Sequence, residues 1–253
     1  DWTYNYQYKN VVLVVLNLYV MIRQICFLSI CTLFFISCSS KEEEYIQINT
    51  PLAFEVPSNF PEEVYNLKAN PPTKLGFELG KKLFYDGRLS ANGFVSCGFC
   101  HEQRTAFTHH GHQFSHGIDD LEGKRNTPAI QNVAFMSEFA WDGATSHLDL
   151  FPIIPITNEV EMWETMSSVI LKIKSDSEYQ YMFEKAFEEG EITTENFLKA
   201  LSQFMVMMIS ADSKYDQYIR KENNVDFSDI EKQGLKLFNA KCATCHQTDL
   251  FTD

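Results

Sequence analysis

Apolar residues in this chain recur mostly at helical spacing, and no series of segments alternates in the manner of β-strands. A short helix is predicted over residues 75–84, where leucines share one face. Further helices are predicted over 162–174, 179–188 and 195–209, and a last one begins at Ser228, where Glu231 completes a capping box. Residues 86–128 are rich in glycine and predicted to be loops. The fold is therefore expected to be mainly α with long loops.

The most apolar stretch lies near the N-terminus and is typical of an export signal. A basic start at 21–24 precedes twelve uncharged residues at 25–36, and small residues with Cys38 follow. The run Phe35-Ile36-Ser37-Cys38 is similar to a bacterial lipobox, in which the cysteine carries the lipid. Residues 1–37 are interpreted as upstream sequence plus signal peptide. The alternative is a transmembrane anchor over 11–36, although polar residues interrupt that stretch.

Residues 38–71 contain four prolines with little periodicity and are interpreted as a lipoprotein tether and linker. We expect an exported protein, in the periplasm or on the cell surface, whose only link to a membrane is a lipid on Cys38.

Composition excludes several classes of protein. Asp and Glu number 34 against 21 Lys and Arg, which gives a net charge of −13 and argues against nucleic acid as a partner. With 11 Gly and 8 Pro in 253 residues, collagen-like and low-complexity structures are also excluded.

Two copies of Cys-x-x-Cys-His carry the chemistry that the sequence reveals. They are Cys97-Gly-Phe-Cys100-His101 and Cys242-Ala-Thr-Cys245-His246. Thiols one helical turn apart can bond to the two vinyl groups of a haem, and the adjacent imidazole can then bind its iron. A zinc site is less favoured because its cysteine pairs usually lie closer in sequence. A thioredoxin-type redox pair needs a βαβ context, which is absent from the predicted elements. Two covalently bound haem c groups are therefore predicted.

The order of several motifs resembles the bacterial di-haem cytochrome c peroxidase family. The segment Leu79–Ser90 leads into the first haem motif, and Arg125-Asn-Thr-Pro128, Trp141-Asp-Gly143, Pro155-Ile-Thr-Asn158 and Glu161-Met162 follow. The resemblance covers about residues 72–253. It implies two cytochrome c-like domains with one haem each, an N-terminal (peroxidatic) domain over 72–210 and an electron-transfer domain that starts at 211–253 and is truncated at the C-terminus.

The resemblance also implies roles for single residues. Cys97, Cys100 and His101 would hold the peroxidatic haem, and Cys242, Cys245 and His246 the electron-transfer haem, with His101 and His246 as iron ligands. Glu161 matches the acid that moves a proton between the peroxide oxygens, although an acidic residue there could simply begin a helix.

Three further matches concern Trp141, Asn126 and His112. Trp141 corresponds to an electron bridge between the haems and Asn126 to a calcium ligand. His112 is the candidate for a distal haem ligand that is removed on activation, against the alternative of a solvated surface histidine. Phe151 departs from the family, which usually carries Gln there.

The sequence therefore predicts an enzyme, a cytochrome-c peroxidase that reduces hydrogen peroxide to water. Electrons would come from a small cytochrome c or cupredoxin with a basic docking face, and the family pattern is compatible with a homodimer. One alternative is a di-haem oxidase that modifies tryptophans of a partner protein. The other is a non-catalytic di-haem electron carrier.

Overall fold

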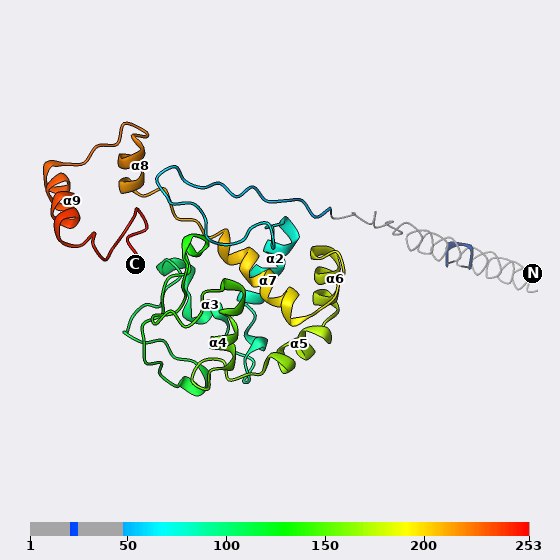
Figure 1. Cartoon of the computed structure of the whole chain (residues 1–253). Coiled ribbons are helices and arrows are strands. Elements are labelled where there is room, and N and C mark those ends of the chain that lie inside the picture. Colours follow the sequence, from blue (N-terminus) through cyan, green and yellow to red (C-terminus); the bar gives the residue numbers. More distant parts are fainter. Residues whose placement is uncertain (1–20, 25–47, 253) are drawn as a thin grey trace, which may run out of the picture. The chain divides into compact units, whose positions relative to one another are not determined.

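The computed structural model describes residues 21–24 and 48–252 (Figure 1). The chain divides into two compact units, residues 1–46 and 47–253. The predicted apolar signal segment over 25–36 and Cys38 lie outside the described residues, while 21–24 are helical. No helix in the described part has the length and apolar content to cross a membrane.

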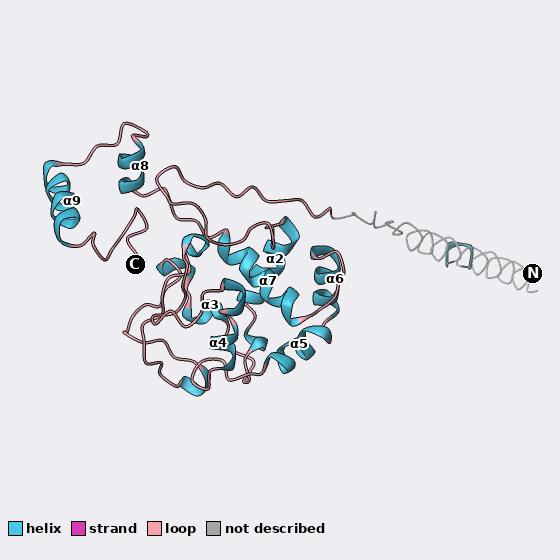
Figure 2. Cartoon of the chain, in the orientation of Figure 1, coloured by secondary structure: helices cyan, strands magenta, loops and turns pink. Residues whose placement is uncertain are grey.

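The second unit is mainly helical, as predicted, and Figure 2 shows helices joined by long loops. Over residues 48–252, β-pairing is confined to isolated bridges. The α-helices are α2 (Lys74–Phe84), α3 (Cys97–Cys100), α4 (Ile153–Thr157), α5 (Met166–Lys174), α6 (Ser177–Ala186), α7 (Thr194–Val206), α8 (Lys214–Arg220) and α9 (Asp229–Lys241). Short 3-10 helices are η1 (Gly87–Leu89), η2 (Gln103–Thr105), η3 (Ile118–Asp120), η4 (Val133–Phe135) and η5 (Leu148–Leu150).

Local capping sets where the predicted helices begin. The hydroxyl of Thr73 accepts a hydrogen bond from the Gly76 N–H at the start of α2, and Thr193 does the same for Asn196 in α7. Ser228 forms the predicted capping box with Glu231, so this expectation is confirmed. Each such cap contributes about 0.5–2 kcal/mol to helix stability.

The predicted helix over 162–174 is wrong at its N-terminus. It begins only at Met166, after the cap Thr165, whose hydroxyl accepts from the Ser168 N–H. Met162 is buried at 3% exposure and its carbonyl accepts from the Ala91 N–H, while Trp163 has φ +46°. Long-range contacts therefore hold this segment in a loop, although its apolar residues have helical spacing.

The core that supports the site lies between α2 and α7, which run side by side in Figure 1. Phe84 of α2 and Phe204 of α7 are buried, with ring centroids 5.1 Å apart. Gly80 allows this close approach, since a Cβ there would lie 1.9 Å from the carbonyl oxygen of Ala200. The end of α2 then lies against the first haem motif, because the rings of Phe84 and His101 are 6.3 Å apart.

Candidate functional site

A cavity of about 700 Å³ brings together several segments that are distant in sequence. Its lining includes Cys100 and His101 of the first motif together with Trp141, Phe151 and Glu161. A smaller, mainly apolar cavity of about 60 Å³ shares His101, Phe151 and Glu161 with it and is also lined by side chains of α2 and α7. The first motif and the predicted distal acid therefore line the same two cavities.

His101 is held in one orientation by the loop that follows the motif. The two cysteines span the single turn of α3, and the His101 N–H donates to the Cys97 carbonyl at 2.9 Å. Its Nδ1 lies 2.9 Å from the Phe107 carbonyl oxygen, and because a carbonyl only accepts, Nδ1 carries the proton. Burial lowers the pKa of His101. The ring is therefore neutral near pH 7, with the Nε2 lone pair left for a metal.

The thiols of the first motif differ from a reactive redox pair. Burial, followed by the charge of Cys100, raises the pKa of Cys97 to about 12, and burial also raises the pKa of Cys100. A nucleophilic cysteine needs the opposite shift. Within residues 21–24 and 48–252, no three His, Cys, Asp or Glu side chains converge as ligands for a metal ion.

Glu161 presents a half-buried carboxyl to the same space. Burial raises its pKa above the usual 4.5, while a hydrogen bond from Asn158 opposes the rise. Its backbone is fixed from the other side, since the Ile118 N–H donates to the Glu161 carbonyl at 2.8 Å. Gly117 permits that approach, because a Cβ there would lie 2.1 Å from the Val160 carbonyl oxygen. Glu161 therefore has the raised pKa and the fixed backbone that a general acid or base needs.

Trp141 and Asn126 both line the larger cavity. The Trp141 indole donates from Nε1 to the Asn126 carbonyl oxygen at 2.6 Å, and its side chain is 61% exposed. Asn126 Nδ2 donates a hydrogen bond to the Gln113 carbonyl oxygen at 2.9 Å. Arg125 and Asp142 form an ion pair of 2.9 Å beside them. The predicted bridge and calcium roles remain predictions.

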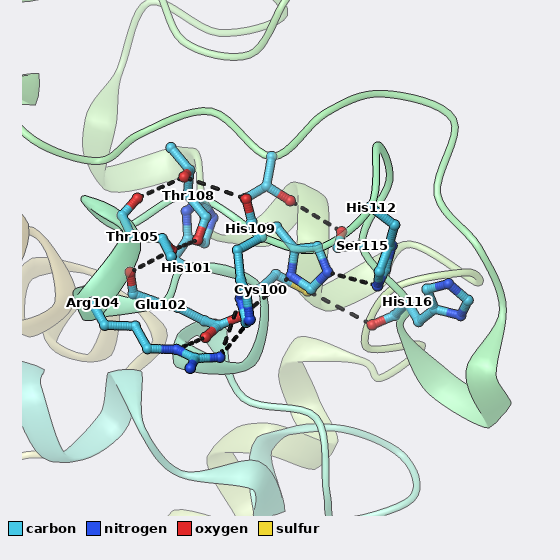
Figure 3. A network of polar contacts seen from close by, with 12 residues as sticks. Cys100, His101, Glu102, Arg104, Thr105, Thr108, His109, His112, Ser115 and His116 are labelled. Atoms are coloured by element: carbon cyan, nitrogen blue, oxygen red, sulfur yellow. Dashed lines mark hydrogen bonds and ion pairs between the residues drawn. The ribbon is translucent and has the colours of Figure 1, made fainter.

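His112 does not line either cavity. It belongs to a cluster of histidines in the loop that follows the first motif (Figure 3). Its Nε2 lies 3.2 Å from His109 Nε2, and its ring stacks edge-on with His116 at 4.9 Å. The cluster also contains His110, which pairs with Glu102 at 2.5 Å. Burial and then the neighbouring His112 lower the pKa of His109. The role of His112 as a distal ligand stays a prediction.

The second motif repeats the local arrangement of the first. The His246 N–H donates to the Cys242 carbonyl at 3.0 Å, and His246 Nδ1 lies 3.0 Å from the Phe251 carbonyl oxygen. Cys242 and Cys245 are exposed, in contrast to the half-buried Cys97 and Cys100. The two histidines therefore have the same tautomer and equivalent carbonyl partners.

Phe107 and Phe251, whose carbonyl oxygens contact the two motif histidines, were not expected from the sequence. Both have left-handed backbones, with φ of +57° and +56°, and each turns its carbonyl toward the histidine of its motif. Bridges between Glu102 and Thr108 and between Gln247 and Thr252 close the two loops. In the sequence, the dipeptide Phe-Thr follows each motif, at Phe107-Thr108 and Phe251-Thr252, and this repeat could have indicated the two equivalent loops.

Comparison with known proteins assigns the family. The model of the di-haem cytochrome c peroxidase family matches residues 74–224. The methylamine utilization protein MauG of Methylorubrum extorquens is 35% identical over 196 residues, which cover 76% of this chain and 55% of that protein. The cytochrome c551 peroxidase of Pseudomonas aeruginosa is 33% identical over 190 residues, which cover 74% of this chain and 54% of that protein.

A solved structure supports the same relationship. The crystal structure of a MauG-like protein associated with microbial copper homeostasis aligns with a TM-score of 0.71 at 29% identity, over 79% of this chain and 61% of that one. The chain spans about half the length of the curated relatives that it matches. Family model, sequence relatives and fold agree, and the resemblance found in the sequence is confirmed: the chain belongs to the di-haem cytochrome c peroxidase family.

Proposed function

We propose that this protein is a cytochrome-c peroxidase of the di-haem type. Hydrogen peroxide takes up two electrons and two protons and leaves as two water molecules. The observation that carries the proposal is that Glu161, a carboxyl with a raised pKa, lines the same cavity as His101, whose Nδ1 is held by the Phe107 carbonyl. A proton carrier and an oriented iron ligand in one cavity fit peroxide reduction.

The residues of the first motif fit a covalently bound haem c, as family membership implies. Cys97 and Cys100 would hold it through thioether bonds, and His101 would supply Nε2 to the iron. The adjoining cavities of about 700 and 60 Å³ give room beside these residues. When bound, the haem supplies an iron that binds peroxide and takes part in electron transfer. Cys242, Cys245 and His246 would hold a second haem c in the same way.

Within this proposal, Glu161 acts as the proton carrier. Its carboxylate accepts a proton from one peroxide oxygen and returns it to the other, which leaves as water. Phe151 lines both cavities where relatives usually carry Gln, so it adds apolar surface to the lining in place of an amide.

Electrons would pass from the C-terminal haem, in the domain that begins at 211–253, to the N-terminal haem in the domain over 72–210. Trp141, at the cavity and exposed, is the proposed bridge. The net charge of −13 favours a donor with a basic docking face, a small cytochrome c or a cupredoxin. We also propose export with a lipid anchor at Cys38, calcium at Asn126, His112 as a removable distal ligand, and a homodimer.

The test compares wild type with Glu161→Gln in the full-length, haem-loaded protein. One haem is reduced, peroxide is added, and oxidation of a reduced small cytochrome is followed. Turnover should fall by about 10²–10⁴-fold in Glu161→Gln, because the amide cannot carry the proton. Glu188→Gln, which removes an exposed carboxylate outside the cavity lining, is the matched control and should keep wild-type turnover.

A second candidate is oxidation of tryptophans in a partner protein. Relatives named MauG are as similar to this chain as those named cytochrome c551 peroxidase, and Phe151 alters the surroundings of the acid. This candidate predicts slow peroxide turnover with a long-lived change in the haem spectrum. A spectrum that peroxide leaves unchanged would instead indicate a pure electron carrier and contradict the role of Glu161.

A further inference from the structure

Asn158 lies where α4 ends, and its side chain can adopt only one orientation of the amide. Its Oδ1 accepts a hydrogen bond from the Val160 N–H at 3.1 Å. Because an N–H can donate only to the oxygen of the amide, this turn assigns the two ends of the side chain. The Nδ2 end therefore faces Glu161, and it donates to Glu161 Oε1 at 2.7 Å.

The backbone of Asn158 organises the same loop. Its carbonyl accepts from the N–H groups of Glu161, at 3.1 Å, and Trp163, at 2.9 Å. Its own N–H donates to the Ile154 carbonyl and closes the last turn of α4. Donor and carboxyl are thus attached to one short loop, and three hydrogen bonds within that loop help to set their spacing.

We propose that Asn158 is the positioning residue of the distal acid: its amide holds Oε1 of Glu161 and leaves Oε2 as the oxygen that carries the transferred proton. In a neutral carboxyl the carbonyl oxygen is a better acceptor than the hydroxyl oxygen, so a donor fixed on Oε1 favours the proton on Oε2. Asn158 is the only hydrogen-bond partner of the Glu161 carboxyl among the residues that the structure describes. The inference rests on the proposed role of Glu161.

The amide also balances the effect of burial on Glu161. Burial alone favours the neutral acid, whereas a hydrogen bond to the carboxylate favours the charged form. A carboxyl that must first accept a proton needs the charged form near neutral pH, and Asn158 stabilises it. The other titratable or charged groups on the cavity lining are Cys100, His101, Lys124, Arg125, Asp142 and Glu159, and Cys97 lines the smaller cavity. Both cysteines would be thioethers in the haem-loaded protein and would not titrate.

The experiment uses Asn158→Asp in the full-length, haem-loaded protein. Aspartate keeps an oxygen for the Val160 N–H and replaces the donor by a second carboxylate. Infrared difference spectra recorded against pH give the midpoint of the Glu161 carboxyl band, which Glu161→Gln identifies by removing it. The midpoint should rise by about one pH unit or more in Asn158→Asp, since two neighbouring carboxylates cannot both ionise easily.

The matched control is Asn66→Asp. This variant also replaces an amide by a carboxylate, but at an exposed position outside the cavity lining. The Ala69 N–H donates to Asn66 Oδ1, and it can donate to a carboxylate oxygen of the aspartate in the same way. Its midpoint should equal that of wild type. Asn158→Ser is the second variant, in case Asn158→Asp does not fold. It keeps an oxygen for the turn but lacks the amide, and its midpoint should rise by less than that of the aspartate variant.

An unchanged midpoint in the folded Asn158 variants would overturn the inference. Peroxide turnover is measured separately on the same samples. If wild type shows no turnover but the midpoint still responds to Asn158, the proposed function fails and the positioning of Glu161 stands. If turnover requires Glu161 but the midpoint of the Glu161 carboxyl band is unchanged in the Asn158 variants, the proposed function stands and the inference fails.

Discussion

Replacing Gly80 by alanine tests whether the close packing of α2 and α7 supports the site. The added Cβ would lie 1.9 Å from the carbonyl oxygen of Ala200 and 2.9 Å from the Cβ of Phe204. Ordinary van der Waals contact begins at 3.4 Å, so the helices would have to separate by about 1.5 Å. The obstructing atom belongs to the backbone of α7 and cannot rotate away.

Two effects of opposite sign decide the result for Gly80→Ala. Alanine is favoured over glycine within a helix by about 0.8–1 kcal/mol. Overpacking a buried contact costs about 1–3 kcal/mol, and occasionally more. With a backbone oxygen so close, the clash should outweigh the gain in helix propensity. We expect the free energy of unfolding to fall by about 2 kcal/mol.

Urea unfolding of the haem-loaded protein, followed by circular dichroism, measures this change. Gly234→Ala is the comparison, because Gly234 also lies inside a helix, α9, but a Cβ there would meet nothing within 4 Å. In the unfolding transition that includes α9, the free energy of unfolding of Gly234→Ala should be about 0.5–1 kcal/mol higher than that of wild type. If Gly80→Ala were as stable as wild type, the close approach of α2 and α7 would be wrong.

Two further predictions concern pH and the loop around Glu161. Burial opposes ionisation of Asp86, but hydrogen bonds from Arg88 and Tyr179 outweigh it and lower its pKa. A lowered pKa in the folded state gives stability that is present above the unfolded pKa of about 4 and lost as pH falls. Asp86→Asn should therefore unfold at a lower temperature than wild type at pH 7, and it should lose less stability as the pH falls into the acid range. Thermal unfolding at a series of pH values measures this, and an equal dependence of the unfolding temperature on pH in the two proteins would contradict it. Gly117→Ala should force Glu161 away from its place, at a cost of about 1–3 kcal/mol, and should shift the infrared midpoint of Glu161. An unshifted midpoint in that variant would mean that the loop holds Glu161 without Gly117.

Sequence patterns predicted helices well where the start of a helix depends on neighbouring residues. Ser228 and Glu231 set the start of α9, since a capping box needs only residues three apart. The helix expected from residue 162 does not begin there, because the Met162 side chain is buried in the core and its carbonyl accepts a hydrogen bond from the Ala91 N–H. Nothing in the local spacing of apolar residues could show that.

The sequence by itself determined the chemistry of the two motifs. Cysteines one turn apart with an adjacent histidine are a local arrangement, and the short turn of α3 follows from it. Only the tertiary structure decided what faces the first motif. It placed Glu161 on the cavity of His101, left His112 outside the lining, and turned the Phe107 carbonyl onto Nδ1. These contacts join residues that are far apart in the sequence or that lie in loops with left-handed residues such as Phe107. Tertiary packing decides how such loops fold back, and the local sequence does not.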